Sequence, residues 1–71
     1  MPFVQVKVWD GFGDENAKKT IGGITKVFTE MGIPKEAVRV LVEEIPKSHW
    51  GIAGEPASER FSDSLGAVKK V

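Results

Sequence analysis

The 71-residue chain lacks cysteine, has a single histidine and carries no net charge. Without cysteine no disulfide can stabilise the fold, and His49 alone argues against a structural metal site. Ten basic residues balance ten acidic ones, so the charge does not indicate binding to nucleic acid or to an anionic membrane. Apolar runs are far shorter than the ~20 residues that cross a bilayer, and the N-terminus has no secretory signal pattern. We therefore expect a cytoplasmic protein with neither nucleic-acid nor membrane partners.

The length of the chain indicates one domain, residues 1–71, with a tail from residue 62 onward that we expect to be loosely ordered. A core of this size rarely supplies more than about 3–5 kcal/mol, so domains of this length depend on some further source of stability. Because disulfides are excluded and a metal site is not indicated, self-association is the source that the sequence leaves.

The first half of the chain predicts a strand followed by a helix. Residues 3–9 alternate with a period of two, which predicts a strand with its valines on a core. Residues 10–13 (DGFG) predict a turn, and Asp14 is the expected N-cap of the helix. Gly22 and Gly23 lie inside this helix, and we interpret them as sites of close packing on a sheet. The apolar residues that recur at helical spacing are Ala17, Ile21, Ile24, Phe28 and Met31.

The second half of the chain predicts a parallel strand and a short arm. Gly32 and Pro34 are expected to end the helix, and residues 38–45 (VRVLVEEI) predict a second strand. A strand, a helix and a strand in this order imply a right-handed crossover between parallel strands. The glycines of residues 51–61 (GIAGEPASERF) indicate a short hairpin or irregular arm. The predicted fold class is α/β, a single β-α-β unit with a short C-terminal hairpin, whose uncovered sheet face we expect another copy of the chain to cover.

Pro2 follows the initiator methionine, where a proline contributes little to a strand but becomes a secondary amine once Met1 is removed. Three further segments occur in a fixed order: Asp10-Gly11 at the end of the first predicted strand, VRVLVEE at residues 38–44, and HWGIAGE at residues 49–55. Together with Pro2, these segments make the chain resemble the 4-oxalocrotonate tautomerase family over most of its length.

The resemblance implies a cofactor-independent tautomerase that interconverts enol and keto forms of a 2-oxo acid in the degradation of aromatic compounds. It also implies a hexamer, a trimer of dimers, with each active site between subunits. Pro2 would be the general base, and Arg39 from a neighbouring subunit would hold the substrate carboxylate with its planar guanidinium group. Trp50 matches the aromatic position of the family's site. The remaining pocket wall would consist of Trp9, Phe12 and Ile52.

The chemistry of Pro2 depends on a free terminal nitrogen. An α-amino group ordinarily has a pKa of about 8. An apolar pocket and a nearby cation both disfavour the protonated amine and lower its pKa, which leaves a base that is largely unprotonated near neutral pH. If Met1 stays attached, the nitrogen of Pro2 is an amide without basicity, and a non-catalytic role is favoured.

Phe12 departs from the family pattern, in which an arginine often binds a second substrate carboxylate at this position. A lost hydrogen bond to a charged group costs about 1.5–3 kcal/mol, or roughly ten- to hundredfold in transition-state binding. Three explanations stay open: a preference for an apolar or aromatic 2-oxo acid enol, an arginine supplied by a different subunit, or another cation such as Arg60. Ile52 cannot activate water as the glutamate of hydrolytic dehalogenase relatives does. The alternative function is a non-catalytic partner subunit of a hetero-oligomeric tautomerase.

Overall fold

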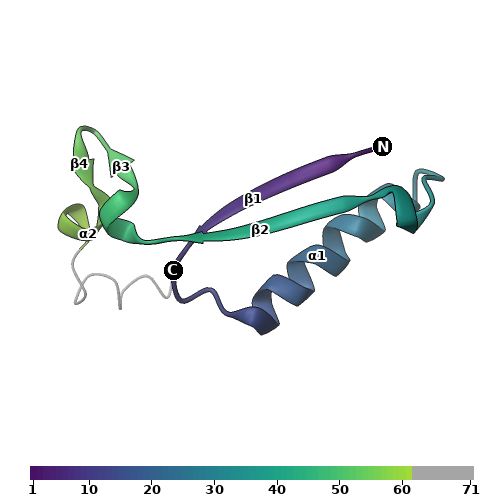
Figure 1. Cartoon of the computed structure of the whole chain (residues 1–71), viewed down its shortest axis with the longest axis horizontal. Helices are drawn as coiled ribbons and strands as arrows, with labels where there is room; N and C mark the ends of the chain where they lie inside the picture. Colours follow the sequence, from purple (N-terminus) through teal and green to yellow (C-terminus); the bar gives the residue numbers. More distant parts are fainter. Residues whose placement is uncertain (62–71) are drawn as a thin grey trace.

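A computed structural model describes residues 1–61 of the chain, and the expected loose tail from residue 62 lies outside the described residues. Two parallel strands, one main helix and a C-terminal hairpin confirm the predicted α/β fold, a β-α-β unit with an arm (Figure 1). In chain order the elements are β1 (Phe3–Trp9), α1 (Asp14–Thr29), η1 (Lys35–Ala37), β2 (Arg39–Ile45), η2 (Lys47–His49), β3 (Gly51–Ile52), β4 (Glu55–Pro56) and α2 (Ala57–Arg60).

Strands β1 and β2 pair in parallel along their whole length, from Phe3 opposite Arg39 to Trp9 opposite Ile45. Because side chains alternate across a strand, this register puts the valines of both strands on one face. Those valines are half-buried beneath α1, whereas the residues between them are exposed on the other face. The valine face is formed by Val4, Val6, Val8, Val40 and Val42.

The N-cap of helix α1 lies one residue earlier in the chain than the sequence predicts. Gly13 is the N-cap, and Asp14 is the first helical residue without a side-chain capping bond, so the prediction of Asp14 as the N-cap is wrong. The other end of the helix also differs from the prediction, because α1 ends at Thr29 and its C-cap is Glu30 rather than Gly32. Gly32 lies two residues further on, where it adopts φ +93° and donates its N–H to the carbonyl of Thr29 at 2.9 Å.

The packing of α1 differs from the expected apolar face in two respects. Ile21 and Met31 are 40% and 67% exposed, so they lie outside the contact with the sheet. Gly22 and Gly23 are exposed, and a methyl group added at either would meet no atom within 4 Å. The interpretation of these glycines as close-packing sites is therefore wrong for the single chain, because the helix approaches the sheet with its other side.

The C-terminal arm is a hairpin with a two-residue turn, followed by the short helix α2. Ala53 and Gly54 both have positive φ, +55° and +85°, and this pair of conformations reverses the chain between β3 and β4. The sequence indicated the hairpin but not α2 or the 3-10 turns η1 and η2, each of which follows a proline. Figure 1 shows the arm at the opposite end of the sheet from the N-terminus.

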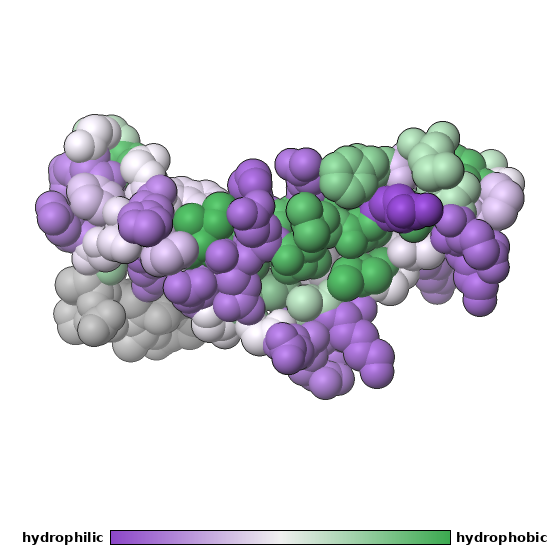
Figure 2. Space-filling view, viewed as in Figure 1, coloured by the Kyte–Doolittle hydropathy of each residue, from purple (hydrophilic) through white to green (hydrophobic). Residues whose placement is uncertain are grey.

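The sheet face opposite α1 is uncovered in the single chain. Phe3 and Leu41 on this face are 59% and 46% exposed. They share the face with exposed polar residues, and Figure 2 shows apolar and polar side chains interspersed over the strands. Ala57 is the single fully buried hydrophobic residue of the part of the chain that the structure describes. A sequence that is 41% hydrophobic thus buries little by itself. None of the helices in residues 1–61 is long and apolar enough to cross a membrane.

Candidate active site

Pro2 and Arg39 lie together at one end of the sheet. The carbonyl of Pro2 accepts the backbone N–H of Arg39 at 3.0 Å, one step before the paired Phe3 and Arg39. The side chain of Arg39 is exposed. Within residues 1–61 the two ion pairs join Lys7 to Glu43 and Arg60 to Glu55, so neither occupies the Arg39 guanidinium group. This end of the chain offers a cation beside the residue that becomes the N-terminus when Met1 is removed.

An aromatic cluster forms at the other end, where β1 finishes against the arm. The rings of Trp9 and Trp50 meet edge-to-face with centroids 5.8 Å apart, and Phe61 lies at the same distance from Trp9. The ammonium group of Lys47 lies 4.9 Å from the centre of the Trp9 ring, a cation–π contact. The half-buried Ile52 belongs to β3, beside this cluster.

Sequence reasoning identified both tryptophans but missed Phe61 and Lys47. Phe61 closes the arm after α2, where its N–H bonds to the carbonyl of Ala57 at 2.8 Å. Phe61 could have been predicted as a member of the cluster, because it is an aromatic residue close to the expected hairpin. Lys47 gave no such signal, because lysine in a polar loop is ordinarily solvated.

One chain does not bring all the predicted site residues together. Pro2 precedes β1 and Trp9 ends it, and six steps at about 3.3 Å each separate Phe3 from Trp9 by about 20 Å. Phe12, Trp50 and the rest of the predicted wall belong to the Trp9 end. The single chain therefore carries two halves of the expected site, a Pro2–Arg39 half and an aromatic half, at opposite ends of its sheet (Figure 1).

Phe12 is half-buried in the loop that connects β1 to α1. Glu44, near the end of β2, reaches this loop from the valine side of the sheet. Its carboxylate accepts the N–H of Gly13 at 2.8 Å and that of Gly11 at 3.4 Å. The neighbouring Glu43 pairs with Lys7 at 2.6 Å on the opposite face, so strand alternation separates the two carboxylates. The role of Glu44 in holding the loop was not predicted.

The described residues thus combine a parallel β-α-β unit with a backbone bond between Pro2 and Arg39 at one end of its sheet. The family model described as tautomerase enzyme matches residues 2–60. The chain belongs to the tautomerase family, and it is an isomerase-class enzyme with the 4-oxalocrotonate tautomerase fold. The predicted family resemblance is therefore confirmed.

Individual relatives agree with this family over most of the chain. A 2-hydroxymuconate tautomerase of Comamonas testosteroni is 40% identical over 60 residues, which cover 83% of this chain and 95% of the relative. The crystal structure of TomN, a 4-oxalocrotonate tautomerase homologue of the tomaymycin biosynthetic pathway, superposes with a TM-score of 0.78 at 33% identity. That match covers 83% of this chain and 92% of TomN.

A third structure shares the fold at lower identity. It is a heterohexamer 4-oxalocrotonate tautomerase from Chloroflexus aurantiacus, with a TM-score of 0.74, 20% identity, and coverage of 83% of this chain and 97% of that one. Oligomers, heterohexamers among them, thus occur among proteins with this fold.

Proposed function

We propose that the protein is a cofactor-independent keto–enol tautomerase acting on a 2-oxo acid, with Pro2 as its general base after removal of Met1. The observation that supports the proposal is the backbone bond between Pro2 and Arg39, which joins these two residues at one end of the sheet. Removal of Met1 would leave a secondary amine at this end. No redox partner is needed, since the reaction moves one proton and leaves the composition of the substrate unchanged.

In the proposed reaction the Pro2 nitrogen removes a proton from the enol hydroxyl group, or from an adjacent carbon, of the substrate. The C–O or C–C π electrons shift, and the protonated amine then returns the proton to another carbon to give the isomer. The guanidinium group of Arg39 holds the carboxylate through two parallel hydrogen bonds and stabilises the negative charge that develops on the enolate. Both roles require Arg39 to be without an internal ion pair, which agrees with its environment within residues 1–61.

The aromatic half of the site supports the use of Pro2 as a base near neutral pH. A cation close to the nitrogen, and walls formed by apolar rings, both lower the pKa of an amine relative to its ordinary value of about 8. Trp9, Trp50 and Phe12 are the candidate wall residues, with Ile52 beside them. The pyrrolidine ring fixes the direction of the lone pair, so less orientational freedom is lost when the proton is transferred.

We propose that the active site is completed between subunits. The aromatic residues lie about 20 Å from Pro2 within one chain, so Pro2 meets an aromatic wall only if another chain contributes it. The family resemblance implies that Arg39 likewise comes from a neighbouring subunit. The uncovered sheet face with Phe3 and Leu41 supports such an assembly. A hexamer of identical chains is the proposed form, in keeping with the hexameric architecture that the family resemblance implies.

The proposed substrate has one carboxylate and an apolar or aromatic remainder, such as phenylenolpyruvate. Phe12 offers no cation, and the loop around it carries the acidic residues Asp10, Asp14 and Glu15 instead. A second carboxylate would meet like charge there, because these acidic side chains are exposed beside Phe12. The 2-hydroxymuconate tautomerases among the relatives have a dicarboxylate in their name, so this preference distinguishes the present chain from them.

The test of the general base uses the processed protein, in which mass spectrometry has established the loss of Met1. Pro2→Ala keeps a primary amine but loses the ring, and we expect kcat for phenylenolpyruvate ketonisation to fall about 100-fold or more, within the range for general-base catalysis. A form that retains Met1 should be inactive, because its Pro2 nitrogen is an amide. Unchanged rates in both forms would show that Pro2 is not the base.

A second candidate function is a partner subunit in a hetero-oligomeric tautomerase. The absence of a cation at Phe12 favours it, because a different subunit could supply the arginine, and the Chloroflexus aurantiacus protein is a heterohexamer. Mass spectrometry of the protein from its native host separates the two functions. Retained Met1, together with a neighbouring gene for a second short proline-starting chain, supports the partner role. Removed Met1 and a lone gene support the enzyme. A cytoplasmic location is proposed for either.

A further inference from the structure

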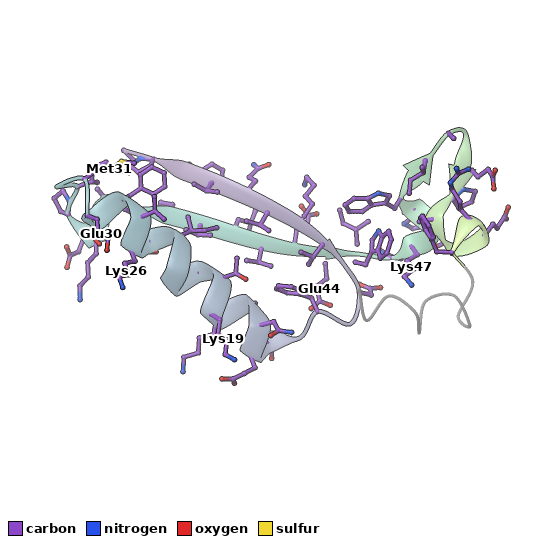
Figure 3. The ribbon with its side chains drawn as sticks, turned by 180° about the vertical axis from the view of Figure 1, so that it is seen from behind. Lys19, Lys26, Glu30, Met31, Glu44 and Lys47 are labelled. Carbon is purple, nitrogen blue, oxygen red and sulfur yellow. The ribbon has the colours of Figure 1, made fainter. Side chains whose placement is uncertain are left out.

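The loop between β1 and α1 is held by a residue from the other strand. Glu44 lies near the end of β2, and Figure 3 shows it beside the chain segment that enters α1. One carboxylate oxygen accepts the N–H of Gly13 at 2.8 Å, and the other accepts the N–H of Gly11 at 3.4 Å. These two residues flank Phe12, so Glu44 anchors the backbone on both sides of that ring.

The loop needs such an anchor because its own sequence does little to fix it. Gly11 and Gly13 have φ of +100° and +88°, and a Cβ at either position would meet nothing within 4 Å. Gly13 is the N-cap of α1 and has no side chain to cap the helix. A carboxylate beside this helix start is also favoured by the positive end of the helix dipole. Asn16 adds one bond from within α1, donating its side-chain N–H to the carbonyl of Phe12 at 2.8 Å.

Glu44 also determines what the loop can bind. The backbone N–H groups of Gly11 and Gly13 are donors that a substrate anion could use, and Glu44 occupies both. A second carboxylate would have to displace Glu44 or lie beside its charge. The loop therefore carries the half-buried Phe12 and offers no pair of free N–H groups at Gly11 and Gly13.

We propose that Glu44 is a positioning residue that orients Phe12 as a wall for the aromatic part of the substrate and excludes a second carboxylate. The proposal rests on the proposed tautomerase function and specifies which substrates its site accepts. Because Glu44 acts through Phe12, it affects the binding of an aromatic group and leaves the proton transfer at Pro2 unchanged.

The test compares Glu44→Ala and Glu44→Gln with Glu43→Ala, a matched control on the neighbouring residue of β2 whose side chain pairs with Lys7 on the other face. Each variant is assayed with phenylenolpyruvate and with the enol of 2-oxobutanoate, which has no ring. We expect Glu44→Ala to raise KM for phenylenolpyruvate about tenfold, with kcat within about twofold, since misplaced binding groups act on uniform binding. KM for the enol of 2-oxobutanoate should stay within about twofold of the wild-type value in every variant. Glu44→Gln keeps one acceptor, so its KM for phenylenolpyruvate should lie between those of Glu44→Ala and wild type.

A double-mutant cycle separates positioning from general stability. If Glu44 acts through Phe12, the variant with both Phe12→Ala and Glu44→Ala has the same KM for phenylenolpyruvate as Phe12→Ala alone. Additive effects, equal losses for both enols, or the same loss in Glu43→Ala would overturn the proposal.

A readout that does not use activity keeps this inference separate from the proposed function. Amide hydrogen exchange at Gly11 and Gly13 should accelerate at least about tenfold in Glu44→Ala and remain unchanged in Glu43→Ala, because exchange follows local opening. Unaltered exchange at Gly13 refutes the anchoring role whatever the activity. If exchange accelerates in Glu44→Ala but the wild-type protein converts neither enol, the tautomerase function and the substrate assignment are refuted, while the anchoring role of Glu44 stands.

Discussion

Replacement of Arg39 by alanine tests the proposed carboxylate-binding role separately from the fold. The bond that joins β1 to β2 at this position uses the backbone N–H of Arg39 and the carbonyl of Pro2, and alanine preserves it. The side chain is exposed and takes part in neither ion pair formed within residues 1–61. Its removal therefore costs the single chain little, so a loss of activity reports on substrate binding.

The size of the effect follows from the bonds that the guanidinium group can make. A hydrogen bond to a charged partner contributes about 1.5–3 kcal/mol, which corresponds to roughly ten- to hundredfold in kcat/KM for Arg39→Ala. Arg39→Lys keeps the charge but not the planar fork, so its loss should be intermediate. The matched control is Lys7→Ala on the same face, where Glu43 neutralises the cation at 2.6 Å. That control should stay within about twofold, because exposed ion pairs contribute about 0–1 kcal/mol.

The assay follows ketonisation of phenylenolpyruvate by ultraviolet absorbance, with size-exclusion chromatography of each variant to establish that its oligomeric state is that of wild type. Raising the salt concentration should weaken substrate binding in wild type more than in Arg39→Ala, because the charge that attracts the carboxylate is screened. An Arg39→Ala protein with wild-type assembly and wild-type kcat/KM would refute the assignment of Arg39 to the site.

Two further predictions concern the scaffold. Gly23→Ala should raise the melting temperature by about 4–8 °C, since alanine is favoured over glycine by about 1 kcal/mol in a helix and meets nothing here; Gly13→Ala, at φ +88°, should lower it. A lowered melting temperature for Gly23→Ala would place that helix face in a tight contact. Leu41→Glu should dissociate the assembly and abolish activity, as measured by analytical ultracentrifugation and the ketonisation assay, and an intact active oligomer would exclude the uncovered sheet face as the interface.

The proposed dependence of this chain on assembly has a simple physical origin. Two strands and one helix form two layers, and each strand of the sheet has one face that the helix cannot reach. The valine face is half-buried beneath α1, while Phe3 and Leu41 remain 59% and 46% exposed. An apolar surface of this kind on a small domain marks an interaction site. In the proposed assembly the same contact both stabilises the fold and brings the halves of the active site together.

Local sequence signals were sufficient for β1, α1, β2 and the hairpin, because strand alternation, helical spacing and glycine turns act over a few residues. Residues 3–9 and β2 follow the period-two pattern, with β2 beginning one residue later than predicted, at Arg39. The alternation also placed Glu43 and Glu44 on opposite faces. The identity of the family was likewise present in the sequence, in Pro2 and in the segments around Arg39 and Trp50.

Contacts between distant residues were decided only by the tertiary structure. The bonds from Glu44 to Gly11 and Gly13, and the packing of Phe61 against Trp9, join residues more than thirty positions apart in the chain. The exposed Gly22 and Gly23 depend on which side of α1 turns toward the sheet, and helical spacing does not determine that side uniquely. The separation of Pro2 from the aromatic cluster arises because a strand is extended, so residues at its two ends cannot share one pocket within a single chain.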